Sequence, residues 1–348
     1  MAKEKLFGKK PDELQLIVKE LGLPRYTARQ IAGWLYNKNV TSFNDMSDLS
    51  KPARQLLKEN FEFGLSEHSR VMVSVDGTKK YLFPVADDKF VEAVYIPEKK
   101  RNTLCVSTQV GCEMNCIFCM TGKQGFQANL TAGDILNQVR SLPERDKLTN
   151  IVYMGMGEPM NNLQAVLDSL EILTSDWGFN INPKKITVST VGILPAMKDF
   201  IDSSPCHLAV SLNTPFEEER RRLMPVENLH PLKNVLFTIK QYDFSRQRRV
   251  SFEYIMLKGL NDTERHVKEL VRILHGIKCR VNLVRFHPFP GTSLQGSDDF
   301  TIEHFKNMLK TKGIIATIRA SRGQDIFAAC GLLSTKNYHH HSNTLPNL

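Results

Sequence analysis

The 348-residue sequence lacks the features of membrane and secreted proteins. No stretch approaches the roughly 18 consecutive apolar residues that a membrane-spanning helix needs. The first residues, MAKEKLFGKKPDEL, lack the apolar segment of a secretory signal. The cysteines number seven, an odd count that is unlike a secreted disulfide framework. We therefore expect a cytoplasmic protein without a membrane anchor, whose cysteines serve metal binding or thiol chemistry.

Hydrophobic residues make up 41% of the chain, enough for one barrel-sized domain with appendages or for two ordinary domains. The formal net charge is +9, and basic runs lie at 99–101, 220–222 and 246–249. A partner that carries many phosphates would favour such charge. A basic surface that serves only solubility fits the charge equally well.

The pattern of apolar residues divides the chain into three regions. Residues 11–62 show helical spacing, with one helix predicted from Thr27 to Tyr36. Between about 68 and 107 short runs predict strands, with Asp76-Gly77 as a hairpin turn. Further on, six β-rich runs alternate with helical segments: NIVYMG, KITVSTVG, HLAVSLN, VSFEYIML, RVNLVRF and GIIATIRA. Such alternation predicts parallel strands in a full or partial α/β barrel, with the chemistry at the strand C-terminal ends.

The tail after Leu333 has no periodicity, and we expect it to be disordered. Its histidines, 339–341, could bind a metal, but a solvated tail is the simpler interpretation.

Three cysteines, Cys112, Cys116 and Cys119, fall within the eight residues CEMNCIFC directly after a predicted strand. Three thiolates from one loop suit a soft metal site. A 4Fe-4S cluster normally takes four cysteines, so three would leave one iron open to a cofactor. The spacing, with Phe118 before the last cysteine, resembles the radical S-adenosylmethionine superfamily. The alternative is a structural zinc site with Cys105 as fourth ligand, although zinc sites usually use two separated pairs.

One strand downstream, the segment MGMGEP could contact the cofactor. Gly155 and Gly157 permit a close backbone approach, and Glu158 supplies a charge for the amino group of S-adenosylmethionine. Taken alone, such a segment is more often a turn with a solvated glutamate.

Several segments resemble the RlmN/Cfr family of radical S-adenosylmethionine RNA methyltransferases: TLCVSTQVGC, the cysteine loop, TGKQGF, MGMGEP, MPVEN, RFHPFPG and RGQDIFAACG. The resemblance covers nearly the whole chain. It implies a six-stranded partial α/β barrel at 98–333. It also implies a helical RNA-binding domain at 1–66, a β extension at 67–97 and a tail at 334–348.

The segments QVGC and QGF are more similar to the RlmN branch, which methylates C2 of adenine, than to the Cfr branch, which methylates C8. The resemblance implies two substrates: an adenosine in the peptidyl-transferase region of 23S rRNA and the adenosine 3′ of the anticodon in tRNAs. C2 lies between two ring nitrogens and carries no proton that a base could usefully remove, so radical chemistry is required. A 4Fe-4S cluster and S-adenosylmethionine would supply it.

The resemblance also implies roles for three residues. Cys330 would carry a methyl group to the base, Cys105 would release the product by forming a transient disulfide, and Glu92 would accept the ring proton. Without the resemblance, Glu92 would be expected to face water, and Cys330 to be a small buried residue. Cys206 and Cys279 match nothing in the family and are expected to be structural.

The remaining implied cofactor contacts are Gly157, Glu158, Ser189, Ser211, Leu212, Asn213 and His287. Many relatives have His at position 213 and Asn at position 287. Both replacements still form hydrogen bonds, but polar residues that cap the ends of strands explain these two positions equally well.

The expected partners are 23S rRNA, tRNA and an electron donor of the flavodoxin or ferredoxin type, with the protein a monomer. We expect action on free or assembling 23S rRNA, with the base out of its stack. A basic RNA-binding protein with a structural metal and no turnover is the alternative of a different class. It leaves MGMGEP and Cys330 unexplained.

Overall fold

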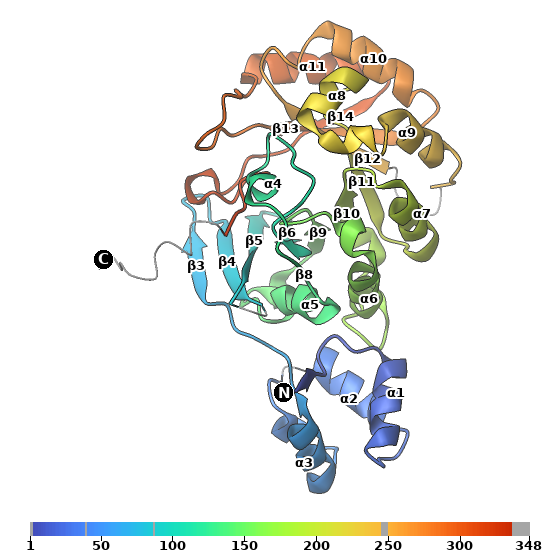
Figure 1. Ribbon diagram of the computed structural model, residues 1–348. Helices are drawn as coiled ribbons and strands as arrows, with labels where there is room; N and C mark the ends of the chain where they lie inside the picture. Colours follow the sequence, from blue (N-terminus) through green and yellow to red (C-terminus); the bar gives the residue numbers. More distant parts are fainter. Residues whose placement is uncertain (1–2, 39, 86–87, 245–249, 336–348) are drawn as a thin grey trace.

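The computed structural model describes residues 3–38, 40–85, 88–244 and 250–335. Figure 1 shows a small helical domain at the N-terminal end of the chain, and a larger domain of strands and helices above it. Within the described residues, no helix is both long enough and apolar enough to cross a membrane.

The N-terminal domain consists of three helices and two short parallel strands: α1 (Pro11–Glu20), α2 (Thr27–Tyr36), α3 (Lys51–Asn60), β1 (Glu4–Lys5) and β2 (Phe61–Glu62). The predicted helices are confirmed. Ser50 caps α3, since its hydroxyl accepts a hydrogen bond from the Ala53 N–H at 3.3 Å. The strand pair was not predicted, because two residues are too few to show a period.

A single ten-stranded sheet runs through the larger domain, in the order β14-β13-β12-β11-β10-β9-β6-β5-β4-β3. Its strands are β3 (Arg70–Val73), β4 (Lys79–Pro84), β5 (Phe90–Glu98), β6 (Arg101–Val106), β9 (Asn150–Tyr153), β10 (Ile186–Thr190), β11 (His207–Ser211), β12 (Val250–Met256), β13 (Cys279–Arg285) and β14 (Ile315–Ile318). A separate antiparallel pair, β7 (Gln109–Val110) and β8 (Ala128–Asn129), flanks the cysteine loop.

Strands β3 to β6 pair in antiparallel fashion, and the predicted Asp76-Gly77 turn joins β3 to β4. From β6 onward each neighbouring pair is parallel. The described strands β14 and β3 form the two open edges of the sheet, so the barrel is partial. The predicted fold class is confirmed. The parallel run has seven strands rather than six, because β6, which is not one of the six β-rich runs, pairs in parallel with β9.

Helices lie between successive strands: α4 (Met120–Gln124), α5 (Ala132–Arg140), α6 (Leu163–Thr174), α7 (Leu194–Ser203), α8 (Glu217–Leu223), α9 (Leu232–Lys240), α10 (Glu264–Leu274) and α11 (Asp299–Thr311). In the part of the chain that the structure describes, six short 3-10 helices lie at Phe43–Asp45, Arg145–Lys147, Pro159–Asn162, Pro183–Lys185, Pro225–Asn228 and Gln324–Ile326. The crossover helices bury an apolar face against the sheet, as Val166 and Leu170 do on α6.

The N-terminal domain packs directly against α5. A Cβ on Gly8 would lie 2.5 Å from the backbone nitrogen of Gly133, so the two chain segments touch with no side chain between them. The Arg140 guanidinium, which is buried, donates to the carbonyl oxygens of Lys38 at 2.8 Å and Val40 at 3.0 Å.

The proposed domain boundaries remain predictions. At the proposed boundary between the barrel and the tail, the backbone N–H of Ser334 donates to Glu92 Oε2 at 2.9 Å, and Thr335 is buried. The three histidines at 339–341 lie outside the described residues.

Candidate active site

A cavity of about 270 Å³, here called the inner cavity, lies at the C-terminal ends of the parallel strands. Its lining includes Cys105, Cys112, Cys116, Cys119, Gly157, Glu158, Ser189, Ser211, Asn213, His287 and Cys330. Most of the predicted site residues therefore meet in one place, although they are spread over more than 200 positions of the chain.

The cysteine loop folds back tightly on itself. Gly111 has a φ of +73°, and a Cβ there would lie 1.7 Å from the carbonyl oxygen of Gly125. The Cys112 N–H donates to that same carbonyl at 3.2 Å. Only glycine fits at position 111, and this close contact holds the two ends of the loop together.

The environment of the three thiols suits a metal cluster better than free thiolates. Burial raises the pKa of Cys112 to about 12, and it raises the pKa of Cys116 well above its ordinary value. Bound iron would offset this cost, because metal coordination displaces the thiol proton. Within the described chain, no three Cys, His, Asp or Glu side chains converge as ligands of a single ion. A 4Fe-4S cluster does not need such convergence, because it spreads three cysteines over three irons.

Glu158 is a buried carboxylate without a cationic partner among the described residues. Its two oxygens accept hydrogen bonds from the backbone N–H groups of Met160 at 3.0 Å and Val191 at 2.9 Å. Burial raises its pKa to about 7. An ammonium group in the cavity would stabilise the charged form, so the site fits the amino group of S-adenosylmethionine.

Gly157 brings the backbone close to the neighbouring strand end. Its φ is +97°, and a Cβ would lie 2.5 Å from Gln109 Cβ. The Gln109 side-chain oxygen accepts a hydrogen bond from the Glu158 N–H at 2.8 Å. These contacts fix the direction of the Glu158 side chain.

The other predicted cofactor contacts fall into two groups. Ser189, Ser211 and His287 line the inner cavity, whereas Leu212 is fully buried and does not line it. Asn213 lines the cavity, but its side-chain oxygen accepts a hydrogen bond from the Ile255 N–H at 2.9 Å. The Asn213 amide thus links the end of β11 to β12 and also lines the cavity. Burial lowers the pKa of His287, which favours its neutral imidazole.

Cys105 and Cys330 line the inner cavity together, and neither forms a disulfide in this structure. Cys105 is buried on β6, whereas Cys330 is exposed. Burial raises the pKa of Cys105 to about 12, and the Cys330 thiol raises it further while Arg319 lowers it. Cys206 is buried in the core, and neither it nor Cys279 lines the inner cavity.

An ion pair that the sequence did not reveal lies beside these thiols. Arg319 Nε and Nη2 each lie 3.0 Å from a carboxylate oxygen of Glu253. The Asn282 side-chain amide donates to Glu253 at 2.8 Å. Both charged residues line the inner cavity. They were missed because a charged residue on a strand is usually interpreted as facing water.

Glu92, the predicted proton acceptor, lies outside the lining of the inner cavity. Its side chain is fully buried, with Lys80 Nζ 2.8 Å from one oxygen and the Ser334 N–H 2.9 Å from the other. Glu92 does not reach the inner cavity in this structure, so a role in proton transfer requires a rearrangement of the residues around its carboxylate.

The segment that carries Cys330, residues 327–335, is anchored on α4 directly after the last cysteine of the loop. The Met120 N–H donates to the Gly331 carbonyl at 2.7 Å, and the Thr121 hydroxyl donates to the Leu333 carbonyl at 2.6 Å. The position of Cys330 thus depends on the helix that follows Cys119.

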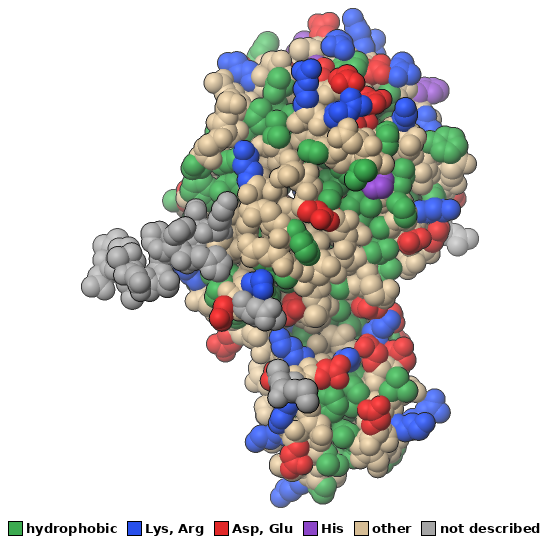
Figure 2. All heavy atoms as spheres, viewed as in Figure 1, with side chains coloured by type: hydrophobic (Ala, Val, Ile, Leu, Met, Phe, Trp, Pro, Cys, Tyr) green, Lys and Arg blue, Asp and Glu red, His purple; other side chains and the backbone are tan. Residues whose placement is uncertain are grey.

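The basic run at 220–222 does not form an open phosphate site. Arg220 is fully buried and paired with Glu227, and Arg221 pairs with Glu217 and Glu218. The suggestion that this run binds phosphates is wrong for Arg220, because its guanidinium donates inward to backbone carbonyls. On the face in Figure 2, acidic and basic side chains are interspersed over the N-terminal domain. The arginines of the run 246–249 lie outside the described residues.

Two families match the sequence. Residues 106–271 match the Radical SAM superfamily, and residues 5–63 match the ribosomal RNA large subunit methyltransferase N-terminal domain. These ranges correspond to the greater part of the barrel and to the small helical domain.

Individual proteins match over nearly the whole chain. The chain is 56% identical to a probable dual-specificity RNA methyltransferase RlmN of Bacteroides thetaiotaomicron, over 96% of this chain and 97% of that protein. It is 42% identical to the dual-specificity RNA methyltransferase RlmN of Syntrophus aciditrophicus, over 93% of this chain and 94% of that protein. A crystal structure of a radical SAM methyltransferase from Sphaerobacter thermophilus has a TM-score of 0.89 and 37% identity, covering 95% of this chain and 99% of that one.

Proposed function

The chain belongs to the RlmN family of radical S-adenosylmethionine RNA methyltransferases, and we propose that it methylates C2 of the adenine in two RNAs. These are an adenosine in the peptidyl-transferase region of 23S rRNA and the adenosine 3′ of the anticodon in tRNAs. The observation that carries the residue assignment is the meeting of Cys105 and Cys330 in the same cavity as the three-cysteine loop.

In this proposal Cys112, Cys116 and Cys119 hold a 4Fe-4S cluster, and Glu158, with the ends of β10, β11 and β13, holds S-adenosylmethionine. The two cofactors would supply the methyl group and the radical chemistry that an unreactive ring carbon requires. Glu158 would bind the ammonium group of the methionine part of S-adenosylmethionine. Because Gly157 has no side chain, the backbone there can lie close to the cofactor.

Cys330 carries the methyl group. This group would lose one hydrogen atom, and the resulting adduct with the adenine one electron, to the radical chemistry that the cofactors would supply, so that Cys330 becomes joined to the base through that carbon. Cys105 then attacks the Cys330 sulfur as a thiolate. A sulfur–sulfur bond forms, the sulfur–carbon bond breaks, and its electron pair stays with the methylene carbon, which takes up a proton to become the methyl group of the product. Arg319 supports this step, because its positive charge favours the Cys105 thiolate. Glu92 accepts the ring proton once the Ser334 N–H has released its carboxylate.

We further propose a monomer that works in the cytoplasm and receives electrons from a flavodoxin or ferredoxin type of donor. Methylation at C8, as in the Cfr branch, is the nearest alternative reaction.

The proposal is tested by reconstituting the protein without oxygen and supplying S-adenosylmethionine, a reductant and unmodified 23S rRNA or tRNA. We expect 2-methyladenosine in the digested RNA, none from Cys330→Ala, and RNA that stays covalently attached to Cys105→Ala. Cys279→Ala is the matched control, since Cys279 lies outside the inner cavity, and it should keep full activity. A product of 8-methyladenosine would contradict the proposed position, and unchanged activity of Cys330→Ala would contradict the proposed carrier.

A further inference from the structure

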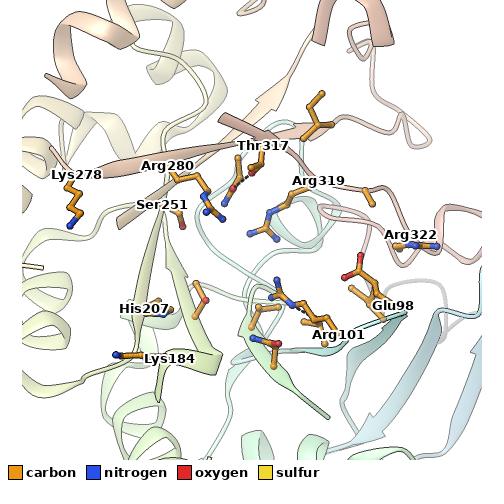
Figure 3. A pocket seen from close by; sticks show the side chains of 18 residues that line it. Glu98, Arg101, Lys184, His207, Ser251, Lys278, Arg280, Thr317, Arg319 and Arg322 are labelled. Atoms are coloured by element: carbon orange, nitrogen blue, oxygen red, sulfur yellow. Dashed lines mark hydrogen bonds between the residues drawn. The ribbon is translucent and has the colours of Figure 1, made fainter. Parts of the chain in front are cut away.

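A second, larger cavity of about 660 Å³ lies at the opposite ends of the parallel strands. We call it the mouth, and its charged lining consists of Glu98, Arg101, Lys184, Lys278, Arg280, Arg319 and Arg322. Figure 3 shows Arg101, Arg280 and Arg319 extending toward the middle of this cavity, with Lys184 and Lys278 farther out.

The mouth is strongly cationic. Six basic side chains and one carboxylate line it, and of the six Arg319 is paired with Glu253. Lys184, Lys278 and Arg280 are exposed, and they form no ion pair with any residue that the structure describes. Cationic walls around a cavity concentrate the positive potential there and attract phosphate groups.

The mouth leads to the inner cavity along the inner face of the strands. On β6, Arg101 and Thr103 line the mouth and Cys105 lines the inner cavity. On β13, Arg280 and Asn282 line the mouth and Val284 lines the inner cavity. Alternate residues of a strand share one face, so these side chains form continuous rows. Four residues of strand span about 13 Å, which is the separation of Arg101 from Cys105 along β6.

The two cavities meet at five residues that line both of them: Ile96, Val152, Arg319, Ala320 and Arg322. The other side of the inner cavity is bounded by the cysteine loop and by residues 328–331 of the segment that carries Cys330. The proposed cofactors would be held on that side by these residues. The mouth is then the approach to the inner cavity that the cofactors would leave open to the substrate.

We propose that the mouth is an RNA-binding site, in which Lys184, Lys278 and Arg280 hold phosphodiester groups next to the target adenosine while the base enters the inner cavity between the strands. This inference rests on the proposed function and adds the direction from which the RNA enters. The cations are distributed over the start of β6, the approach to β10, the start of β13 and the segment after β14. Cations that are spread out in this way suit the phosphodiester backbone of an RNA, whereas a single small anion is held by donors that converge on one point.

The test compares two double variants of the reconstituted protein. Lys278→Gln/Arg280→Gln removes two charges from the mouth. Lys233→Gln/Lys258→Gln is the matched control, because both lysines are exposed and neither lines a described cavity. Affinity for a fluorescent, unmodified anticodon stem-loop RNA is measured between 50 and 200 mM salt, and methylation kinetics follow on the same RNA.

We expect the mouth variant to bind RNA about tenfold more weakly, and its slope of log affinity against log salt to be shallower by about 1.4 to 1.8. Its KM for RNA should rise while kcat at saturating RNA stays unchanged. The control should match the unsubstituted protein in affinity and slope.

An equal loss of RNA affinity in both double variants would overturn the proposal, because it would show that RNA is attracted by the overall positive charge and not by the mouth. Unchanged RNA affinity in the mouth variant, together with loss of saturable binding of inorganic pyrophosphate, would overturn it in favour of a small-anion site. The identity of the methylated nucleoside separates the two proposals. If the unsubstituted protein binds RNA through the mouth but forms no 2-methyladenosine, the proposed reaction is refuted and the proposed RNA-binding site is not.

Discussion

The Lys80 ammonium lies 2.8 Å from the carboxylate of Glu92, and the two side chains are only 6% and 0% exposed. Lys80 is on β4 and Glu92 on β5, at diagonal positions of an antiparallel pair. The same carboxylate accepts the backbone N–H of Ser334, so this buried pair ties the segment that carries Cys330 to the sheet.

Lys80→Met should destabilise the protein by about 3 to 5 kcal/mol, because it leaves the Glu92 charge buried without a partner. The measurement is the free energy of unfolding from urea denaturation. Lys80→Met/Glu92→Leu should recover most of this loss, since a hydrophobic pair of similar volume can replace a buried ion pair. The double variant should still lack methylation activity if Glu92 is the proton acceptor. A double variant that regains activity would remove Glu92 from the mechanism.

Arg220→Met should lower stability by about 3 to 5 kcal/mol and also weaken the binding of S-adenosylmethionine. The guanidinium pairs with buried Glu227, and it donates to the carbonyls of Ser211 at 3.1 Å and Val191 at 2.8 Å, at two strand ends of the cofactor site. Arg221→Met is the adjacent control, and a change within about 0.5 kcal/mol is expected because its ion pairs are at the surface. Urea denaturation and calorimetric titration with the cofactor measure the two effects. Similar losses in both variants would show that the burial of Arg220 has no special importance.

Gly111→Ala should abolish iron incorporation, because the added methyl group would collide with the Gly125 carbonyl. Gly125→Ala is the control in the same loop. Its φ is also positive, at +78°, but nothing lies within 4 Å of the added Cβ, so only a conformational cost of about 1 kcal/mol is expected. Iron and sulfide analysis after reconstitution distinguishes the two. Full iron content in Gly111→Ala would contradict the contact.

The stability of the cofactor-free protein should decrease between pH 4.5 and 7 through Glu158. Its pKa rises from 4.5 to about 7 because of burial, so in this interval the folded state binds more protons than the unfolded state. This contribution, about 3 kcal/mol at most, is present in full below pH 4.5 and is lost as the pH rises. Glu158→Gln should lack it, which urea denaturation at several pH values would show. The affinity for S-adenosylmethionine should increase over the same interval in the unsubstituted protein only. Parallel stability curves for both proteins would contradict the assignment.

The strands could be predicted because alternating and continuous apolar runs are local properties of the sequence. The helix at Thr27–Tyr36 and the turn at Asp76-Gly77 have local signals of the same kind. The cysteine loop and MGMGEP were recognisable because the cofactor chemistry requires closely spaced residues.

The charged residues could not be placed in this way. Arg220 lies in a charged run, and Glu92 and Glu253 lie on strands, where a charged side chain is usually interpreted as facing water. Only the packing of distant segments makes these three residues buried or inward-facing. The mouth was missed for the same reason, because its lining comes from the starts of several strands and no short segment contains it. The partner of Glu92, Ser334, lies 242 positions away in a tail that was expected to be disordered.

Strand β6 sets a limit on how this chain can change during evolution. Arg101 and Cys105 lie on the same face because an even number of positions separates them. Insertion or deletion of one residue between them would turn one of the two away from the interior. Substitutions at Arg101 can be tolerated gradually as RNA affinity drifts, whereas a change in the length of this strand would disconnect the two cavities at once. Divergent members of the family should therefore vary in the residues of β6 long before they vary in its length.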